Sequence, residues 1–233
     1  VPGAMPSPPF AIHPLARDTD DHGVDLDRLR HALNKPQAHW LRHGLRLHLP
    51  ADDAAIDDHE PLGPPDALQG HALREYAFAA WRQAGARPSL DALHASLLAR
   101  AAIAPGADGR IVLAQALDQV APFADAAVRE GLRDAGGLQA YALDIDGLPL
   151  AGTLAGVHAR GLFRAALRPK GLHGGHALRH RLDALVAATL GLPLLELHAD
   201  GDSVALAERA PPPRDAAIAS LRALFALQRR MAS

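Results

Sequence analysis

Cysteine is absent from this chain of 233 residues, so disulfide frameworks, thiolate zinc sites, iron–sulfur clusters and cysteine nucleophiles are excluded. Long hydrophobic runs are also absent, since no stretch approaches the roughly 18 to 20 apolar residues that cross a membrane. The opening residues 1–10 carry no basic region, which argues against a signal peptide, and a chain that begins at Val1 resembles an excised fragment. With 48% apolar and 21% charged residues, the composition predicts a soluble globular protein without membrane contact, for which the cytoplasm fits best.

The motifs of two large enzyme classes are missing. No GxxxxGK[ST] or GxGxxG loop is present to cradle a nucleotide phosphate. Serine is rare, and no GxSxG turn carries one, which excludes a serine hydrolase. The net charge of −2 gives no global electrostatic case for nucleic-acid binding. We therefore predict neither a cofactor nor a small-molecule substrate.

Histidine is abundant, and two groups of histidines have spacings that could suit a metal ion. His39 and His43 lie four residues apart on one expected helix face, but the glutamate of an HExxH zinc motif is missing. His173, His176 and His180 form a second group in the sequence HGGHALRH. In both places the sequence favours ordinary solvated histidines over zinc, and no metal site is predicted.

The first 136 residues carry helical patterns after a lead-in. Residues 1–23 are rich in Pro, Asp and His and are predicted to be flexible. Trp40, Tyr76 and Trp81 fall on apolar helix sides and are expected in the core. Residues 24–136 are thus predicted to form a helical subdomain. Its helices are expected over about 25–34, 36–47, 67–83, 90–103 and 111–136, with an acidic, proline-rich connector at 50–65.

The apolar period changes from 3.6 to 2 near residue 137, which indicates strands. Asp146-Gly147 is a strong two-residue hairpin signal, and a second tight turn follows at Arg160-Gly161. The predicted fold class is α+β, with a mixed α/β core and a closing helix over 137–233. Strands are expected over 138–145, 148–157, 162–167, 193–198 and 203–207, with helices over 175–190 and 215–231.

This order of elements resembles the restriction-endonuclease-like fold, the PD-(D/E)xK nuclease core. An active nuclease of that fold has an aspartate in the second strand and Asp/Glu-x-Lys in the third, because two carboxylates hold a divalent ion and the lysine orients water. Here Ala155 occupies the place of the aspartate, and Ala166 or a neighbour replaces the second ligand. We expect Ala155 and Ala166 to lie close together near the edge of the sheet, as a vestigial site with no catalytic residue.

One segment, 158–182, is basic and contains no acid. Phe163 is the only aromatic residue within it, so electrostatic guidance of phosphates or contact with another subunit is favoured over base stacking. The alternative is an ordinary solvated face. The predicted nucleic-acid or partner face consists of Arg160, Arg164, Arg168, Lys170, Arg179 and Arg181.

Four blocks of the sequence, in the right order, resemble the C-terminal region of the RecC family, the gamma subunit of exodeoxyribonuclease V. The similarity covers almost everything after residue 24. The family's C-terminal domain has a nuclease-like fold without catalytic residues, which agrees with the alanines described above. The blocks are LDRLRHALNKPQAHWLRHGLRLHL at 26–49, the acidic D-x-E-P block at 58–68, GTLAGV with ARGLFRAALRP at 152–169, and the closing FALQRRMAS.

The resemblance implies a noncatalytic scaffold and strand-guiding domain of the bacterial RecBCD helicase–nuclease, which acts in DNA repair and homologous recombination. Its implied partners are the RecB and RecD motor subunits, single-stranded DNA and duplex ends. Two alternatives stay open: an active Mg-dependent nuclease with displaced ligands, and a stand-alone helical interaction module. The acids available to a displaced site are Asp144, Asp146, Glu196 and Glu208.

Overall fold

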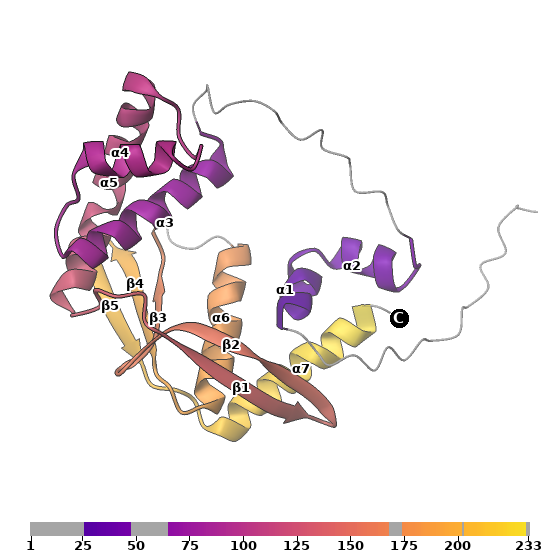
Figure 1. Cartoon of the computed structure of the whole chain (residues 1–233). Coiled ribbons are helices and arrows are strands. Elements are labelled where there is room, and N and C mark those ends of the chain that lie inside the picture. The colour runs from indigo at the N-terminus through magenta and orange to yellow at the C-terminus, as the bar shows by residue number, and fades with distance from the viewer. Residues whose placement is uncertain (1–25, 48–64, 168–173, 202, 232–233) are drawn as a thin grey trace, which may run out of the picture.

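A computed structural model describes residues 26–47, 65–167, 174–201 and 203–231, and these form a mixed α+β protein (Figure 1). The predicted α+β class is confirmed. The lead-in 1–23 and most of the acidic connector lie outside the described residues. In chain order the elements are α1 Leu26–Asn34, α2 Pro36–His43, α3 Ala67–Ala84, α4 Leu90–Leu98, α5 Gly106–Arg129, β1 Gly137–Ile145, β2 Leu148–His158, β3 Gly161–Ala165, α6 Gly174–Thr189, β4 Leu194–Asp200, β5 Ser203–Arg209 and α7 Arg214–Met231.

The boundaries of α3 follow from local chemistry that the sequence predicts. The Asp66 side chain accepts the amide proton of Gln69 at 2.7 Å, and the Gln69 side chain accepts that of Asp66 at 3.1 Å, which makes a reciprocal capping box. Gly85 ends the helix in the left-handed region at φ +73°. Both predicted ends of this helix are therefore confirmed.

The bounds of α4 and α5 differ from the predicted ones. Helix α4 stops at Leu98 and not near Ile103, while α5 begins at Gly106 and ends at Arg129. Residues 106–110, which precede the predicted start at 111, form the first turn of α5, where Asp108 complements the positive end of the helix dipole. Helix α5 is long and apolar enough to span a membrane by length and composition, but its apolar side packs in the protein core.

The five strands form one sheet in the order β1-β2-β3-β4-β5. Strands β1, β2 and β3 pair antiparallel, β4 lies parallel to β3, and β5 pairs antiparallel with β4. The β1–β2 hairpin turns at Asp146 and Gly147, both with positive φ, which is the two-residue turn that the sequence predicts. The βββαβ order is thus present as expected.

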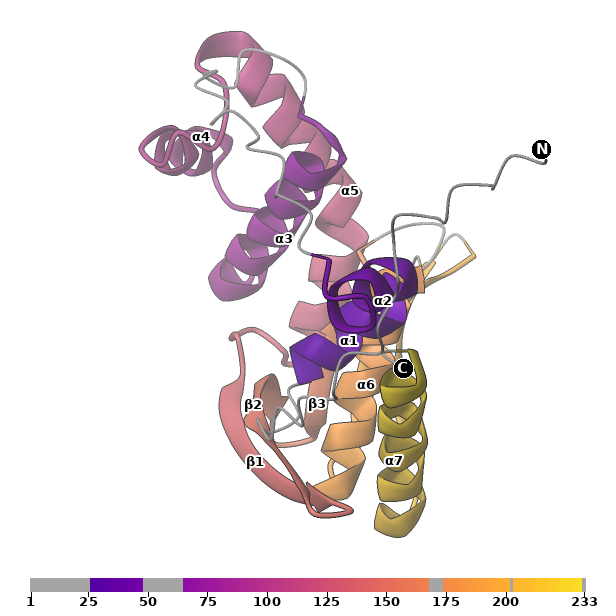
Figure 2. The ribbon, with the colours of Figure 1, turned by 90° about the vertical axis from the view of Figure 1, so that its right-hand side faces the viewer.

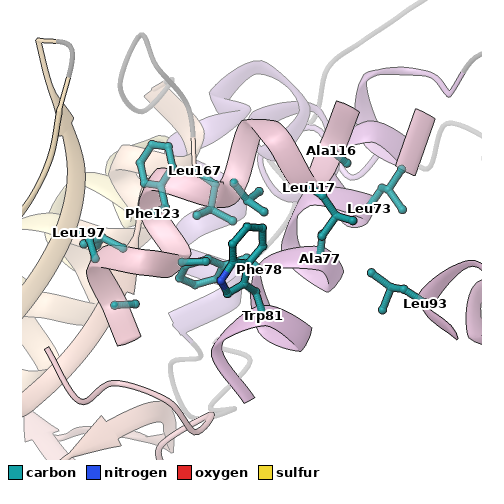
Figure 3. Close-up of a cluster of buried hydrophobic side chains, with 14 of the residues drawn as sticks. Leu73, Ala77, Phe78, Trp81, Leu93, Ala116, Leu117, Phe123, Leu167 and Leu197 are labelled. Atoms are coloured by element: carbon teal, nitrogen blue, oxygen red, sulfur yellow. The ribbon is translucent and has the colours of Figure 1, made fainter. Parts of the chain in front are cut away.

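Two apolar clusters flank the sheet. One lies between α3, α5 and the sheet; Figure 3 shows Phe78, Trp81, Phe123 and Leu197 packed together in it. The other joins β1 and β2 to α6, α7 and α1, and includes the fully buried Leu29. Figure 2 shows α3, α4 and α5 grouped apart from α1, α2, α6 and α7. Helix α1 therefore packs against α6 and α7, although these helices follow the hairpin much later in the sequence.

The apolar side predicted for α2 is wrong. Trp40 is 43% exposed, and the residue that the helix buries is His39, at 2% exposure. The indole lies over Gly44, where an added Cβ would come within 2.8 Å of the Trp40 ring. Trp81, in contrast, is buried as predicted, and Tyr76 is half-buried with its hydroxyl 2.9 Å from Ser96 Oγ.

Candidate nucleic-acid interface

A groove of about 480 Å³ lies where α3, β2, β3 and α6 meet. These elements come from distant parts of the sequence, because α3 precedes β2 by more than 60 residues. The groove is open to solvent and contains both charged and aromatic side chains. Its residues include His71, Glu75, Arg82, Ala155, Phe163, Arg164, Ala165, His176, Arg179, His180 and Asp183.

Arg164 of β3 lines this groove and is held by several hydrogen bonds. Its Nε and Nη2 donate to Asp183 Oδ2 at 2.9 and 2.6 Å, a fork-like contact with a carboxylate that is only 3% exposed. Its Nη1 donates to the backbone oxygen of Ala155 at 2.8 Å. Asp183 also accepts from Arg30 of α1, so one buried carboxylate is held by two guanidinium groups.

The structure brings Ala155 into the groove but not Ala166. Ala155 lines the groove, and so do Ala165 and Leu167, which lie on either side of Ala166 in sequence. Ala166 is buried, and its backbone amide donates to Leu197 at 2.8 Å. Because neighbouring residues of an extended chain point to opposite faces, the side chain that shares the groove with Ala155 is that of Ala165.

The other described cations of the basic segment, Arg160, Arg179 and Arg181, do not share one face. Arg160, at the β2–β3 turn, donates to Glu130 and Glu208, each at 3.1 Å. Side-chain hydrogen bonds to Glu130 and Glu208 raise the pKa of Arg160. Counter-acids thus come from positions outside segment 158–182, so the lack of acids within that segment does not leave Arg160 and Arg164 without a carboxylate partner.

Helix α6 presents its two arginines on different sides. Arg179 lies at the groove, whereas Arg181, two residues on, is exposed and does not line it. The helical rotation of about 100° per residue puts these two side chains on nearly opposite faces. Arg168, Lys170 and His173 lie outside the described residues.

Imidazoles and one further carboxylate surround the groove. The rings of His71 and His176 meet edge to face with centroids 4.8 Å apart, and His71 Nε2 lies 3.9 Å from Glu75 Oε1. Burial lowers the pKa of His180, assisted by the Arg164 charge, so this imidazole is neutral at pH 7. Burial also raises the pKa of Glu75, which the neighbouring His176 and Arg179 oppose.

Sequence reasoning missed His71 and Glu75 as members of this site. Both lie on α3, about 100 residues before the β3–α6 segment that forms the other wall. No local pattern distinguishes them from other polar residues on an exposed helix side. Their role in the groove arises only from the packing of α3 near β3 and α6.

No metal cluster forms among the residues that the structure describes, which contain no group of three or more His, Asp or Glu side chains able to hold an ion. His39 and His43 are a pair only, with ring centroids 4.6 Å apart. The acids considered for a displaced nuclease site are also apart. Asp144 and Asp146 lie at the β1–β2 hairpin, where Asp146 pairs with Arg222, while Glu196 and Glu208 lie on β4 and β5 and pair with Arg209 and Arg160.

Comparison with known protein families gives a match over nearly the whole chain. No curated protein sequence gives a significant match. The family model described as the RecC C-terminal domain matches residues 21–231, which include every described helix and strand. The four resembling sequence blocks overlap this span. The chain therefore belongs to the RecC C-terminal domain family.

Proposed function

We propose that this chain is a noncatalytic scaffold and strand-guiding domain of the RecBCD exodeoxyribonuclease V complex, acting in double-strand break repair and DNA degradation. Membership of the RecC C-terminal domain family supports the assignment to that complex. The proposed partners are the RecB and RecD motor subunits, single-stranded DNA and duplex ends, in the bacterial cytoplasm. In this role the domain needs no cofactor, metal ion or small-molecule substrate.

The proposed core is restriction-endonuclease-like and inactive, over residues 137–233, beside a helical part over 24–136. The mixed sheet with a β1–β2–β3 meander, a helix α6 and a strand β4 parallel to β3 supports this fold. The same intact βββαβ order weighs against a stand-alone helical module. The fold provides the frame, and the residues in the groove decide the activity.

One observation carries the proposal of inactivity, namely the guanidinium of Arg164 in the groove beside Ala155. In a metal-dependent nuclease this region holds carboxylates that bind a divalent cation. Here Ala155 and Ala165 supply no ligand, and the carboxylate that is present, Asp183, is already bound by Arg164 and Arg30. A fixed positive charge in that position also repels a metal cation.

A nuclease assay tests this proposal directly. We expect the purified chain to leave labelled single-stranded and duplex DNA intact in the presence of Mg²⁺ or Mn²⁺, while an active metal-dependent nuclease digests both under the same conditions. Cleavage that EDTA abolishes, in a sample free of contaminating nuclease, would favour the alternative of an active enzyme with displaced ligands.

The scaffold role requires a second experiment, because inactivity alone does not define a partner. Tagged chain should capture RecB and RecD when the three are co-expressed. The nuclease assay and the capture assay are independent of each other. An inert chain that captures neither motor subunit would contradict the scaffold role and leave only the inactive fold.

A further inference from the structure

The groove carries more fixed positive than negative charge. Three guanidinium groups, those of Arg82, Arg164 and Arg179, line it, and guanidinium groups stay protonated at all ordinary pH values. They face two carboxylates, Glu75 and Asp183. Asp183 is shared with a fourth guanidinium, from Arg30. The groove therefore has an excess of positive charge.

Two of the three guanidinium groups are held in place by the protein. Arg82 donates to the backbone oxygens of Leu132 and Asp134 and lies 4.6 Å from the centroid of the Phe163 ring. Arg164 is bound to Asp183 and to the Ala155 carbonyl oxygen. Both guanidinium groups that line the groove are thus preorganised, so a ligand does not need to order them.

Arg179 differs from these two because its side chain is exposed at the groove, where the Glu75 carboxylate is a neighbouring charge. His176 lies one helical turn before it, near the start of α6. Both side chains line the groove and can supply N–H donors to a ligand there. The aromatic ring of Phe163 and the apolar side chain of Leu167 complete the wall.

We propose that this groove binds a backbone phosphate of a single nucleic-acid strand directly, with guanidinium groups in the place where an active nuclease would use metal ions. This inference rests on the strand-guiding function proposed above and specifies its contact point. Because residues 155 and 165 are alanines, the groove lacks the carboxylates of an active nuclease. Such carboxylates would repel a phosphate when no metal ion is bound. The volume of about 480 Å³ is within the usual range for ligand sites and accommodates a phosphate together with its sugar.

The test uses the full chain and a fluorescent oligothymidylate, titrated at several salt concentrations in the presence of EDTA. Arg179→Gln should weaken binding about tenfold, as for loss of one hydrogen bond to a charged group. It should also reduce the salt slope by about 0.7, the value for one phosphate contact on a single strand. Circular dichroism should be unchanged, because Arg179 is exposed.

Two further variants make the test specific. Arg181→Gln is the matched control, since it removes the same charge from the same helix outside the groove, and its affinity should stay within about twofold of the parent. Glu75→Gln should tighten binding by about two- to fivefold, because it removes a competing carboxylate at the groove. A general effect of net charge would move Arg179→Gln and Arg181→Gln equally, and that result would overturn the proposal.

The remaining outcomes separate this inference from the scaffold proposal. Parent-like oligonucleotide binding by Arg179→Gln would overturn the groove site, even if the chain still captures the motor subunits. Loss of motor-subunit capture in this variant with oligonucleotide binding intact would identify the groove as a protein contact and also overturn it. Inorganic phosphate should compete only weakly, and binding of free phosphate without binding of the oligonucleotide would contradict strand recognition.

Discussion

Asp183 joins parts of the chain that lie far apart in sequence. Its buried carboxylate accepts from Arg30, 153 positions earlier in the chain, and from Arg164. Removal of one partner from a buried ionic cluster leaves charges that water cannot reach, which costs far more than the loss of an exposed ion pair. Asp183 therefore fixes α1, β3 and α6 in one arrangement.

We expect Asp183→Ala to lower the free energy of unfolding by about 3 to 5 kcal/mol, measured by urea denaturation. Asp27→Ala is the control, because Asp27 also contacts Arg30 but is 77% exposed, and its cost should be below about 1 kcal/mol. Similar losses in the two variants would show that burial of the Asp183 cluster adds nothing. Because Arg164 belongs to the same buried cluster, a substitution at Arg164 is expected to change the stability of the fold as well as its surface charge.

His39 gives the protein a predicted sensitivity to acid. Burial lowers the pKa of His39 to about 4, and the nearby charges of His43, Arg28 and His31 add to the effect. In the unfolded chain its pKa is 6.5, so the unfolded state takes up the proton first as the pH falls. The stability that the neutral ring contributes is complete above pH 6.5 and is lost between about 6.5 and 4.

The measurement is the free energy of unfolding as a function of pH, with His39→Gln for comparison. The parent should lose stability with a slope of at most about 1.4 kcal/mol per pH unit from this residue across that window. His39→Gln cannot take up a proton, so the difference between the two proteins should shrink toward acid pH. Parallel curves from pH 7 to 4 would rule out a neutral buried His39 as the cause.

At the scale of elements, the two capped helices α3 and α4 offer a direct comparison. Asp66 makes a reciprocal capping box at the start of α3, whereas the Ser89 hydroxyl lies 3.5 Å from the Ala92 amide, at the limit of a hydrogen bond. Asp66→Ala should cost about 1 to 2 kcal/mol, and Ser89→Ala should cost less than half of that. Thermal or urea unfolding of both variants measures the difference. Equal costs would contradict the geometric difference between the caps.

The β3–β4 pairing depends on Gly161. Its φ is +144°, and a Cβ built there would lie 2.3 Å from the Pro193 carbonyl oxygen, so alanine forces the two strands apart. We expect Gly161→Ala to cost more than about 3 kcal/mol, a value typical of strain or overpacking in the core. Gly191→Ala is the control, because it has a positive φ with open space around it, and about 1 to 2 kcal/mol is expected. A Gly161→Ala variant no less stable than Gly191→Ala would place β4 elsewhere.

At the scale of the whole molecule, α1 packs together with α6 and α7 in the cluster that covers β1 and β2. Leu29 is fully buried in the same cluster as Leu182, Val186 and Phe225. The start of the described chain is therefore held by elements close to its end.

We expect Leu29→Ala to cost about 2 to 5 kcal/mol and to speed amide hydrogen exchange in α6 and α7 as well as in α1. The matched control is Leu97→Ala, whose side chain belongs to the cluster of α3, α4 and α5. It should affect exchange in those helices first. An effect of Leu29→Ala limited to α1 would mean that α1 only rests on the surface of the domain.

The element order could be predicted from the sequence because its causes are local. The hairpin at Asp146-Gly147 needs two positive φ values in adjacent residues, and the start of α3 needs a side-chain cap three residues from an amide. Helix ends such as Leu98 and Gly106 were harder to predict, since the last turns compete with packing against other elements. The absence of acids at Ala155 and in β3 is likewise visible in the sequence alone.

Tertiary structure alone decided which charges meet and which side chains are buried. The basic segment 158–182 contains no acidic residue. In the structure, however, Arg160 and Arg164 bind carboxylates that lie 19 to 48 residues away in the sequence. The sequence pattern favours Trp40 over His39 as the buried residue of α2, and the structure has the reverse. The sequence determined the order of elements, the family and the absence of acids at Ala155 and in β3, because these depend on residue identity and near neighbours. The groove, the fixed guanidinium groups that line it and the place of α1 depend on contacts between distant segments, which only the packed chain brings together.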